Sequence, residues 1–490
     1  MKKFTGLVVL LAALVLGSYY GMGYLTERKV RESLNIVNQS NGVAAEIVQY
    51  KRGWFTSEAS LDWRLHVPER VVQIDGKSQT VPAEDYQMQM PITIYHGPVI
   101  FSDRGIKFGL GFAHTLLTLP AQYTDKFNNL FSSQSTQPKL NMSFFVNYFG
   151  NTSIDTSLPA FKLFAKEGNA EFNWLGMSTS TSVSSNMSEV DGNITIDGLH
   201  FTKDQIDTTM SAITSEYNLH KTPTGLFLGD ASLSFPSLVV MNKDAKLLEL
   251  GQFDMRSNSD IDDGLFSSQF KTSLEKIVAN GKTYGPGNLE VAIRNLDADV
   301  LAKLNDQLNQ LQQGTDAQRQ QAVFAMLPEL PRLFSKGAEF EISEMNFVMP
   351  QGTLEGNLMV SLPKGEFANP FELMQKIQGN GKLKIPAAVV QQLMTESIKQ
   401  KMMSPQPSAS QQGPVDQVQP QASTDTTTQA ATSSADVNEQ ATTLATKQLS
   451  TLVQNGVLTV QGSDYVIEVS LNQGQLAVNG KPFNPAMLKF

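Results

Sequence analysis

Two serine–lysine pairs have the spacing that some acyl-transfer enzymes use for catalysis. Ser268 precedes Lys271 by three residues, and Ser273 precedes Lys276 by three residues. On a helix this spacing brings the hydroxyl beside the amine, which can then activate the serine as a nucleophile. Residues 265–274 instead alternate as a β-strand does, and on a strand the two side chains of each pair point to opposite faces. The sequence therefore predicts no serine–lysine catalysis here.

An acidic cluster at residues 260–263 precedes Gly264 and resembles a calcium-binding loop. If Gly264 occupied the sixth position of such a loop, Ser259 would be the first ligand and Ile261 the third. Isoleucine has no oxygen to offer a calcium ion, so the ligand pattern fails. An Asp-Gly pair between two alternating runs is typical of a β-hairpin turn, which we predict instead.

The stretch 50–65 concentrates arginine, glycine, two tryptophans and two acids. Its alternation predicts an early strand, with Phe55, Leu61 and Trp63 on one face and charged side chains on the other. Gly53 permits a bulge or a close approach of the backbone. We therefore interpret these three apolar residues as the lining of a core or of a groove, and not as a catalytic site.

The composition excludes several classes of protein. The chain has 490 residues, a net charge of −9, five histidines and no cysteine. Disulfides, thiol nucleophiles and cysteine zinc sites are thereby excluded. An acidic chain without a basic stripe is not expected to bind nucleic acid. We expect no cofactor, no metal and no enzymatic activity, with one alternative left open: a hydrolase whose carboxylates meet only in the fold.

The N-terminus predicts a membrane anchor. Residues 4–25 carry no charge, and about 20 apolar residues suffice to span the hydrocarbon core. We predict an uncleaved transmembrane helix over residues 1–25, with a cleaved signal peptide as the alternative. The N-terminus would lie in the cytoplasm and the large domain outside it, because long domains translocate with little regard to flanking charge. Gly17 and Gly21, four residues apart, could let two such helices pack as a homodimer.

The predicted secondary structure changes after the anchor. Residues 26–42 predict an amphipathic helix, and residues 43–298 predict short antiparallel strands with frequent turns. Residues 299–403 predict an αα-hairpin, a β-hairpin and a further helix, with Leu304 and Leu308 in a leucine seam of the first helix.

The C-terminal part begins with a segment of another kind. Residues 404–438 contain no leucine, isoleucine, aromatic or basic residue, which predicts a disordered linker. Residues 439–490 predict a helix and strands that dock back on the main sheet, because an isolated hairpin is only marginally stable. The predicted fold class is α+β, mainly β: one N-terminal transmembrane helix, then an extended antiparallel sheet on which an αα-hairpin and short helices pack.

Four short motifs in a fixed order resemble the bacterial YdgA-like family. They are YKRGWFTS at residues 50–57, HGP at 96–98, GNLEV at 287–291 and QGQLAVNG at 473–480. The resemblance implies an inner-membrane protein of a Gram-negative bacterium with a periplasmic β-rich domain, and it offers no catalytic residues to transfer. The plan of an anchor followed by a long antiparallel sheet is also similar to that of AsmA-like envelope proteins, which are thought to move or shield lipids.

These observations lead to three functional hypotheses. The first is a non-enzymatic envelope protein that acts through protein contacts. The second is a carrier or shield for lipids or lipophilic cargo, with Leu61, Trp63, Leu304 and Leu308 among the residues that line an apolar groove. The third is the carboxylate hydrolase.

Overall fold

The computed structural model describes residues 2–38, 43–67, 70–74, 77–311, 326–367, 369–403 and 434–488. Its contacts divide the chain into two compact units. The first contains residues 1–339 and 363–370, and the second contains residues 340–362 and 371–490.

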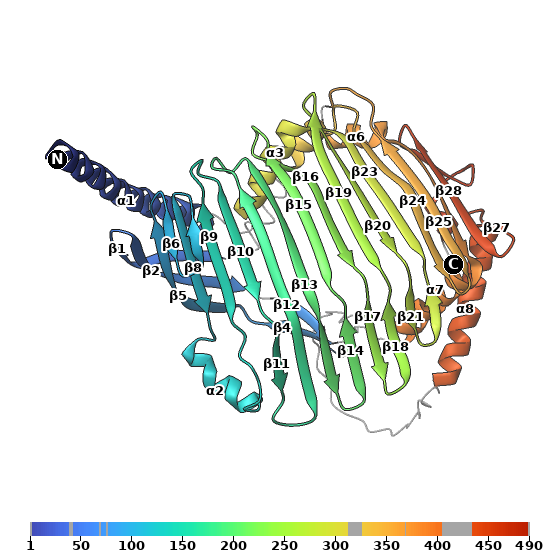
Figure 1. Cartoon of the computed structure of the whole chain (residues 1–490). Helices are drawn as coiled ribbons and strands as arrows, with labels where there is room; N and C mark the ends of the chain where they lie inside the picture. The colour runs from blue at the N-terminus through green and yellow to red at the C-terminus, as the bar shows by residue number, and fades with distance from the viewer. Residues whose placement is uncertain are drawn as a thin grey trace, which may run out of the picture. The chain divides into compact units, whose positions relative to one another are not determined.

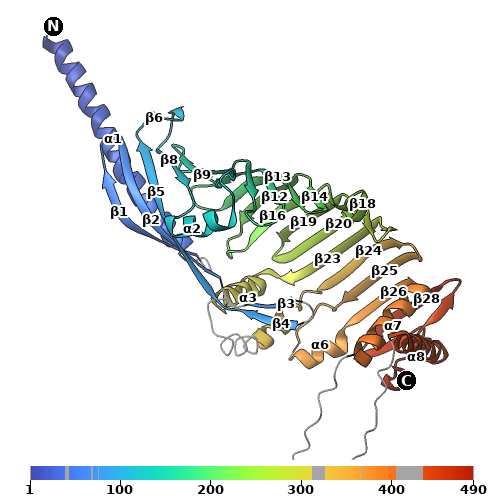
Figure 2. The ribbon, with the colours of Figure 1, turned by 90° about the horizontal axis from the view of Figure 1, so that it is seen from below.

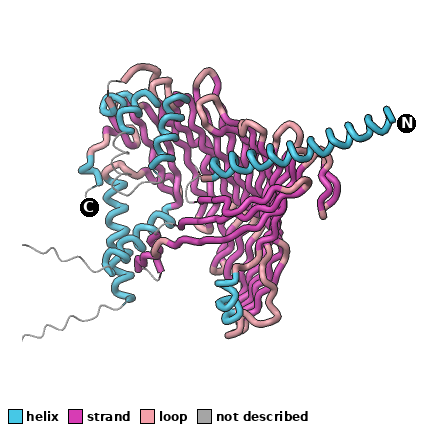
Figure 3. Tube along the Cα trace, turned by 90° about the vertical axis from the view of Figure 1, so that its left-hand side faces the viewer, coloured by secondary structure: helices cyan, strands magenta, loops and turns pink. Residues whose placement is uncertain are grey.

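The chain begins with one continuous helix, α1 (Lys2–Val37). The predicted anchor and the predicted amphipathic helix are therefore parts of a single element, whose N-terminal half extends beyond the strands in Figure 3. Within the residues that the structure describes, no helix combines the length and the apolar character needed to cross a membrane. The membrane-spanning role of α1 stays a prediction.

The stretch 50–65 is not one strand, as we expected, but two. It is divided between β1 (Val43–Arg52) and β2 (Thr56–Val67), which pair antiparallel around a tight turn at residues 53–55. The amide of Gly53 donates to the carbonyl of Thr56 at 2.9 Å, and a Cβ on Gly53 would lie 2.4 Å from that oxygen. Only glycine allows this approach, so Gly53 closes a hairpin and does not bulge a strand.

The sheet of the first unit grows outward from this hairpin. β5 (Glu84–His96) pairs with β2 over residues 84–95 and with β8 (Gly111–Leu117) over its last residues. The C-terminal half of α1 packs on these strands, and Leu34 joins Leu61, Met90 and Ile94 in a buried cluster. Here an amphipathic helix covers one face of a sheet and closes a core.

Nine further strands continue the sheet, each antiparallel to the one before it, as Figure 1 shows. In order of pairing they are β9 (Leu140–Val146), β10 (Thr152–Leu158), β12 (Ala170–Val183), β13 (Glu189–Lys203), β15 (Ile213–Lys221), β16 (Phe227–Phe235), β19 (Phe253–Asp262), β20 (Leu265–Leu274) and β23 (Gly287–Asp297).

A second tier of short strands prolongs the long ones. It contains β11 (Phe161–Phe164), β14 (Ile206–Met210), β17 (Leu238–Asn242), β18 (Ala245–Leu250), β21 (Ile277–Ala279) and β22 (Lys282–Tyr284). The tiers meet along a line that we call the crease, formed by Gly176, Gly198 and residues 211–212, 236–237, 251–252, 275–276 and 285–286. At this level β12 and β13 have an irregular register and the later strands are interrupted. Such aligned irregularities bend a sheet.

Three small elements complete the β-rich part. The hairpins are β3 (Arg70–Ile74) with β4 (Lys77–Val81), and β6 (Ile100–Ser102) with β7 (Gly105–Lys107). The helix predicted after Pro120 is present as α2 (Ala121–Leu130).

The predicted αα-hairpin is only partly observed. Its first helix is α3 (Ala298–Leu311), but residues 312–325 lie outside the described part of the chain. The next elements are a 3-10 turn, η1 (Leu327–Glu329), and one helical turn, α5 (Leu330–Leu333). Pro328 and Pro331 begin these turns, since proline cannot continue a helix that precedes it. Leu304 and Leu333 pack together with Leu296 in a second buried cluster.

The second unit contains the last strands and helices of the chain. Its strands are β24 (Glu339–Met349), β25 (Gly352–Ser361), β26 (Gln378–Pro386), β27 (Thr459–Gln461), β28 (Asp464–Asn472), β29 (Gln475–Val478) and β30 (Lys481–Pro482), and its helices are α6 (Pro370–Lys376), α7 (Ala387–Met403), α8 (Ser434–Gln454) and η2 (Pro485–Leu488).

The C-terminal strands join a strand that precedes the linker in sequence, because β28 pairs antiparallel with β26 over residues 464–471. Residues 404–433 of the predicted linker lie outside the described part of the chain. Its last five residues are not linker, because α8 begins at Ser434. The helix begins early because Ser434 and Asp436 favour a helix N-terminus.

Candidate functional site

One face of the central sheet carries a row of apolar side chains beside the crease. Neighbouring strands place these residues opposite or next to one another. We call them the upper row: Leu140, Leu158, Met177, Ile196, Ile213, Phe235, Phe253 and Leu274.

A second row lies on the other side of the crease. Each member is the direct partner of the next across the sheet. We call it the lower row: Trp174, Leu199, Met210, Leu238, Leu250 and Ile277. On β12 and β13 the pairing is irregular at Gly176 and Gly198. Each strand gains one residue there, which keeps the upper and lower rows on the same face.

This apolar face is only partly covered. Between residues 118 and 225, and again between residues 229 and 291, every residue is described and no hydrophobic side chain is buried. The buried clusters of the first unit lie around α1 and around α3, and of the row residues only Leu140, at the end nearest α1, packs against one of them. Apolar side chains that share a face over many strands and stay partly in water form a surface of the kind that binds a ligand or partner.

The opposite face is polar and more exposed. Asn193, Glu216, Asn218 and Arg256 alternate with the apolar residues along their strands and point away from them.

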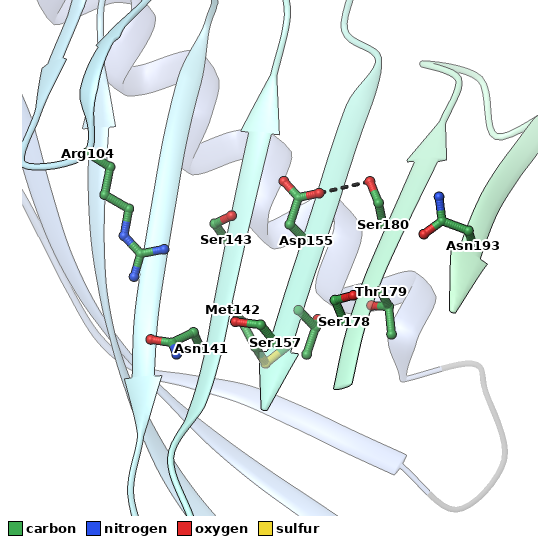
Figure 4. Close-up of a pocket in the computed structure, with 11 residues that line it drawn as sticks. Arg104, Asn141, Met142, Ser143, Asp155, Ser157, Ser178, Thr179, Ser180 and Asn193 are labelled. Carbon is green, nitrogen blue, oxygen red and sulfur yellow. Dashed lines mark hydrogen bonds between the residues drawn. The ribbon is translucent and has the colours of Figure 1, made fainter. Parts of the chain in front are cut away.

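A shallow concavity of about 240 Å³ lies over β9, β10 and β12 and is lined by Asn141, Ser143, Asp155, Ser180 and other polar residues, with Arg104 at its rim (Figure 4). Ser180 donates a hydrogen bond of 2.8 Å to Asp155. None of the lining residues is a histidine or lysine that could act as the base for a serine.

A buried histidine joins α1 to the sheet. His96 and Ser57 are each 1% exposed, and the Oγ of Ser57 lies 3.1 Å from Nε2 of His96. The hydroxyl of Tyr19 donates to the carbonyl of Val99 at 2.7 Å, and the Tyr19 ring packs edge-on against Phe55. Nucleophilic catalysis would need access for a substrate, and these side chains have none. The contact is therefore a structural junction between helix and sheet.

The fit of α1 at this junction depends on Gly23. A Cβ on Gly23 would lie 2.7 Å from Cε1 of His96, whereas a Cβ on Gly21 would meet no atom within 4 Å. We expect Gly23→Ala to lower the melting temperature of the detergent-solubilised protein and Gly21→Ala to leave it unchanged or raise it. Both changes gain the same helix propensity of about 1 kcal/mol, so the pair isolates the clash. Equal melting temperatures would contradict this packing.

His96 should also make the stability depend on pH. Burial lowers the pKa of His96 from its ordinary value of 6.5, the charge of Arg52 lowers it further, and the backbone of Tyr19 acts in the opposite direction. Below about pH 6.5 the unfolded chain therefore binds a proton that the folded chain does not, and the folded state loses stability. The full contribution of neutral His96 is present above that pH.

We expect the free energy of unfolding to fall by up to about 1.4 kcal/mol per pH unit below pH 6.5, relative to a His96→Gln variant. The comparison with that variant removes the contribution of the other four histidines. Parallel pH profiles for the two proteins would show that His96 is protonated equally in both states.

The residues proposed from sequence as groove or core lining occupy different environments. Leu61 is 3% exposed, and Trp63 packs against the same cluster beneath α1. Leu304 is 7% exposed in the cluster beneath α3, and Leu308 lies in α3 with its side chain outside the described part. Phe55 is 51% exposed beside Tyr19. The structure does not bring these five residues together on one surface.

The serine–lysine pairs and the acidic cluster that suggested catalysis or calcium binding are parts of strands and turns of the sheet. Ser268, Lys271 and Ser273 lie on β20, and Lys276 pairs with Glu249 at 3.0 Å. Asp263 and Gly264 have positive φ angles of 49° and 74°, as a hairpin turn between β19 and β20 requires. Among the described residues, no group of three metal-ligating side chains could hold an ion.

The glycine pair proposed as a dimer face lies on an open side of α1. A Cβ on Gly17 or Gly21 would touch no other atom.

Sequence reasoning missed the two rows. Their members are ordinary alternating strand residues, and only the register of eleven separate pairings aligns them. The available signal was the repeated small or irregular residue at the middle of each long β-segment, such as Gly176 and Gly198.

A profile of the DUF945 family, described as bacterial proteins of unknown function, matches residues 1–486. The chain belongs to the DUF945 family. Neither a curated protein nor a solved structure matches it. The function of this DUF945 protein must therefore be inferred from its own apolar face, crease and helix junction.

Proposed function

We propose that this DUF945 protein is a membrane-anchored periplasmic carrier or shield for lipids or lipophilic molecules, whose acyl chains lie along the crease. The observation that supports it is the pair of apolar rows, which flank the crease on one face and stay partly exposed. The proposal has no catalytic step and needs no cofactor.

The chemistry of this face suits acyl chains. The rows contain leucine, isoleucine, methionine and aromatic side chains, which gain free energy by leaving water and need no hydrogen-bond partner. The crease crosses seven neighbouring strands from β12 to β23. At about 4.8 Å per strand this is a length of roughly 29 Å. One leaflet of a bilayer is roughly 15 Å of hydrocarbon, so an extended acyl chain can lie along the crease.

The proposed location follows from the uncharged segment 4–25 at the start of α1. We propose that the part of this segment that precedes Tyr19 is a single-pass anchor in the inner membrane, with the N-terminus in the cytoplasm and the sheet in the periplasm. From Tyr19 onward α1 packs on the sheet. The apolar side chains of Leu14, Val15 and Leu16 in this segment are exposed. The open Gly17–Gly21 side leaves room for a second copy of α1. Membership of the YdgA-like group stays part of the same proposal.

Protein contacts alone, our first expectation from sequence, explain this face less well. Protein interfaces gain specificity from hydrogen bonds at a polar rim around an apolar centre. Here the apolar residues form two long rows, and a polymethylene chain complements such a line without polar contacts. The carboxylate hydrolase stays an alternative. Its support is a second, open concavity of about 400 Å³ on the polar face, which Asp191, Glu216 and Asp230 help to line.

Photo-crosslinking in living cells tests the proposal. A benzoyl-phenylalanine side chain is placed at Phe253 in the upper row or at Leu175, which is exposed on the opposite face. We expect mass spectrometry of the purified protein to find lipid adducts at position 253 and none at position 175. Protein adducts at position 253, or no adduct there, would reject the carrier and favour protein contacts.

A further inference from the structure

A group of exposed apolar side chains gathers at one end of the first unit. Trp54, Phe55, Phe101, Ile106, Phe108 and Phe149 form what we call the aromatic rim. All six are more than half exposed, and Phe149 is 85% exposed. They come from three separate connections: the β1–β2 turn, the β6–β7 hairpin with its flank, and the β9–β10 turn. Large exposed apolar patches are rare on monomeric proteins and mark surfaces that bind something.

Hydrogen bonds hold these connections together beside α1. Tyr148, next to Phe149, donates to the carbonyl of Pro98, and Tyr19 of α1 donates to the carbonyl of Val99. The amide of His96 donates to the carbonyl of Phe55 at 3.0 Å. All three connections therefore lie around the turn of α1 that contains Tyr19. In Figure 2, β6 stands away from the sheet on the side of the N-terminal half of α1.

The surface of α1 beside the aromatic rim also carries exposed aromatic side chains. Tyr20 and Tyr24 are exposed, and the guanidinium of Arg52 stacks over both rings at 5.0 and 5.6 Å. Tyrosine, tryptophan and stacked arginine are the side chains favoured where hydrocarbon meets the lipid headgroups. This level is also where the uncharged segment 4–25 ends.

At this end of the sheet the exposed apolar residues are concentrated in the connections near α1, with Phe227 at the start of β16 as a further one. At the same end of the sheet, the later turns at residues 184–188, 222–225 and 262–264 consist of serine, threonine, asparagine, aspartate, glycine, proline and one methionine. Neither folding nor solubility explains why exposed apolar side chains gather in the connections around α1 while the other turns at this end are polar.

We propose that the aromatic rim inserts into the headgroup region of the bilayer that holds α1, and so seats the sheet directly on the membrane surface. The proposal rests on the membrane location in the proposed function but not on lipid cargo. The occupant is the bilayer because the rim lies beside the end of the proposed anchor, and a second copy or a soluble protein would have to displace that bilayer to reach it. Insertion of about 5–10 Å is typical of such apolar surfaces.

Quenching of tryptophan fluorescence by brominated lipids tests this in the full-length protein. The chain has three tryptophans, at positions 54, 63 and 174. Three single-tryptophan proteins are reconstituted into phosphatidylcholine vesicles brominated near the glycerol end of the acyl chains. The first keeps only Trp54, the second carries F149W, and the third carries N186W in a polar turn at the same end of the sheet; the remaining tryptophans are changed to phenylalanine.

We expect the Trp54 and F149W proteins to be quenched at least about twice as strongly as the N186W protein, because only their indoles reach the depth of the bromines. Equal, weak quenching in all three would overturn the proposal and assign the rim to a protein partner. A fourth protein that keeps only Trp174, in the lower row, reports lipid at the crease. Quenching of Trp174 tests the lipid carrier independently of the aromatic rim. The failure of one proposal can therefore be told from the failure of the other.

Discussion

Lipid recovered with the protein is expected to fall by at least about tenfold when Ile196 and Leu250 are both replaced by glutamine. Ile196 belongs to the upper row and Leu250 to the lower row, so the two changes place amides on both sides of the crease. Each apolar side chain contributes roughly 1.5–3 kcal/mol when a ligand buries it fully. Even half of that from each side chain exceeds the roughly 1.4 kcal/mol that corresponds to a tenfold change. The measurement is lipid per protein after extensive detergent washing.

The matched control changes two leucines to glutamine on the other face. Leu175 and Leu247 are exposed and follow or precede the inward-facing Trp174 and Leu248 along their strands, so strand alternation places them on the other face. The L175Q/L247Q protein has the same change in composition, and we expect it to retain its lipid. If both double variants lost lipid equally, the lipid would be bound to the general apolar surface of the protein and not to the crease.

Leu61→Ala is expected to destabilise the first unit by about 2–5 kcal/mol, whereas Leu233→Ala is expected to cost only about 1 kcal/mol. Both changes delete the same atoms from a strand. Leu61 is 3% exposed in the closed cluster beneath α1, and Leu233 lies on the partly exposed apolar face between the upper row and the end of its strand. Deleting a buried side chain adds the cost of a cavity to the lost transfer free energy, while the partly exposed site lets water enter.

Tryptophan fluorescence during urea unfolding measures both variants, since all three tryptophans belong to the first unit. Similar costs of several kcal/mol for the two changes would mean that the apolar face is packed as tightly as the cluster under α1. It would then be a closed core and could not accept a lipid.

Several features of this protein follow from short-range patterns alone. Alternation of apolar and polar side chains predicts the strands because the side-chain period of a strand is two. Pro120 predicts the start of α2, and Asp263-Gly264 predicts the turn between β19 and β20, because these residues restrict or permit particular backbone angles locally. The docking of the C-terminal strands follows from the marginal stability of a hairpin in isolation.

Where local patterns misled us, a single backbone contact decided the outcome. Gly53 has the same preference for a bulge as for a tight turn, and only the approach of the Thr56 carbonyl makes residues 50–65 a hairpin. By contrast, the prolines at 328 and 331 predict a break in the second helix of the αα-hairpin, and they lie in the short turns η1 and α5. Spacing predicts which residues share a face, but it does not predict whether the backbone can stay regular between them.

The sequence by itself determined the β-rich class, because apolar and polar residues alternate along its strands. Only the tertiary structure decided where a functional surface lies. The upper and lower rows, the crease and the junction of Tyr19 with His96 join residues that are far apart in the chain, as the 80 residues between Tyr19 and Val99 illustrate. Their alignment depends on strand register, and a shift of one residue would turn every row to the other face.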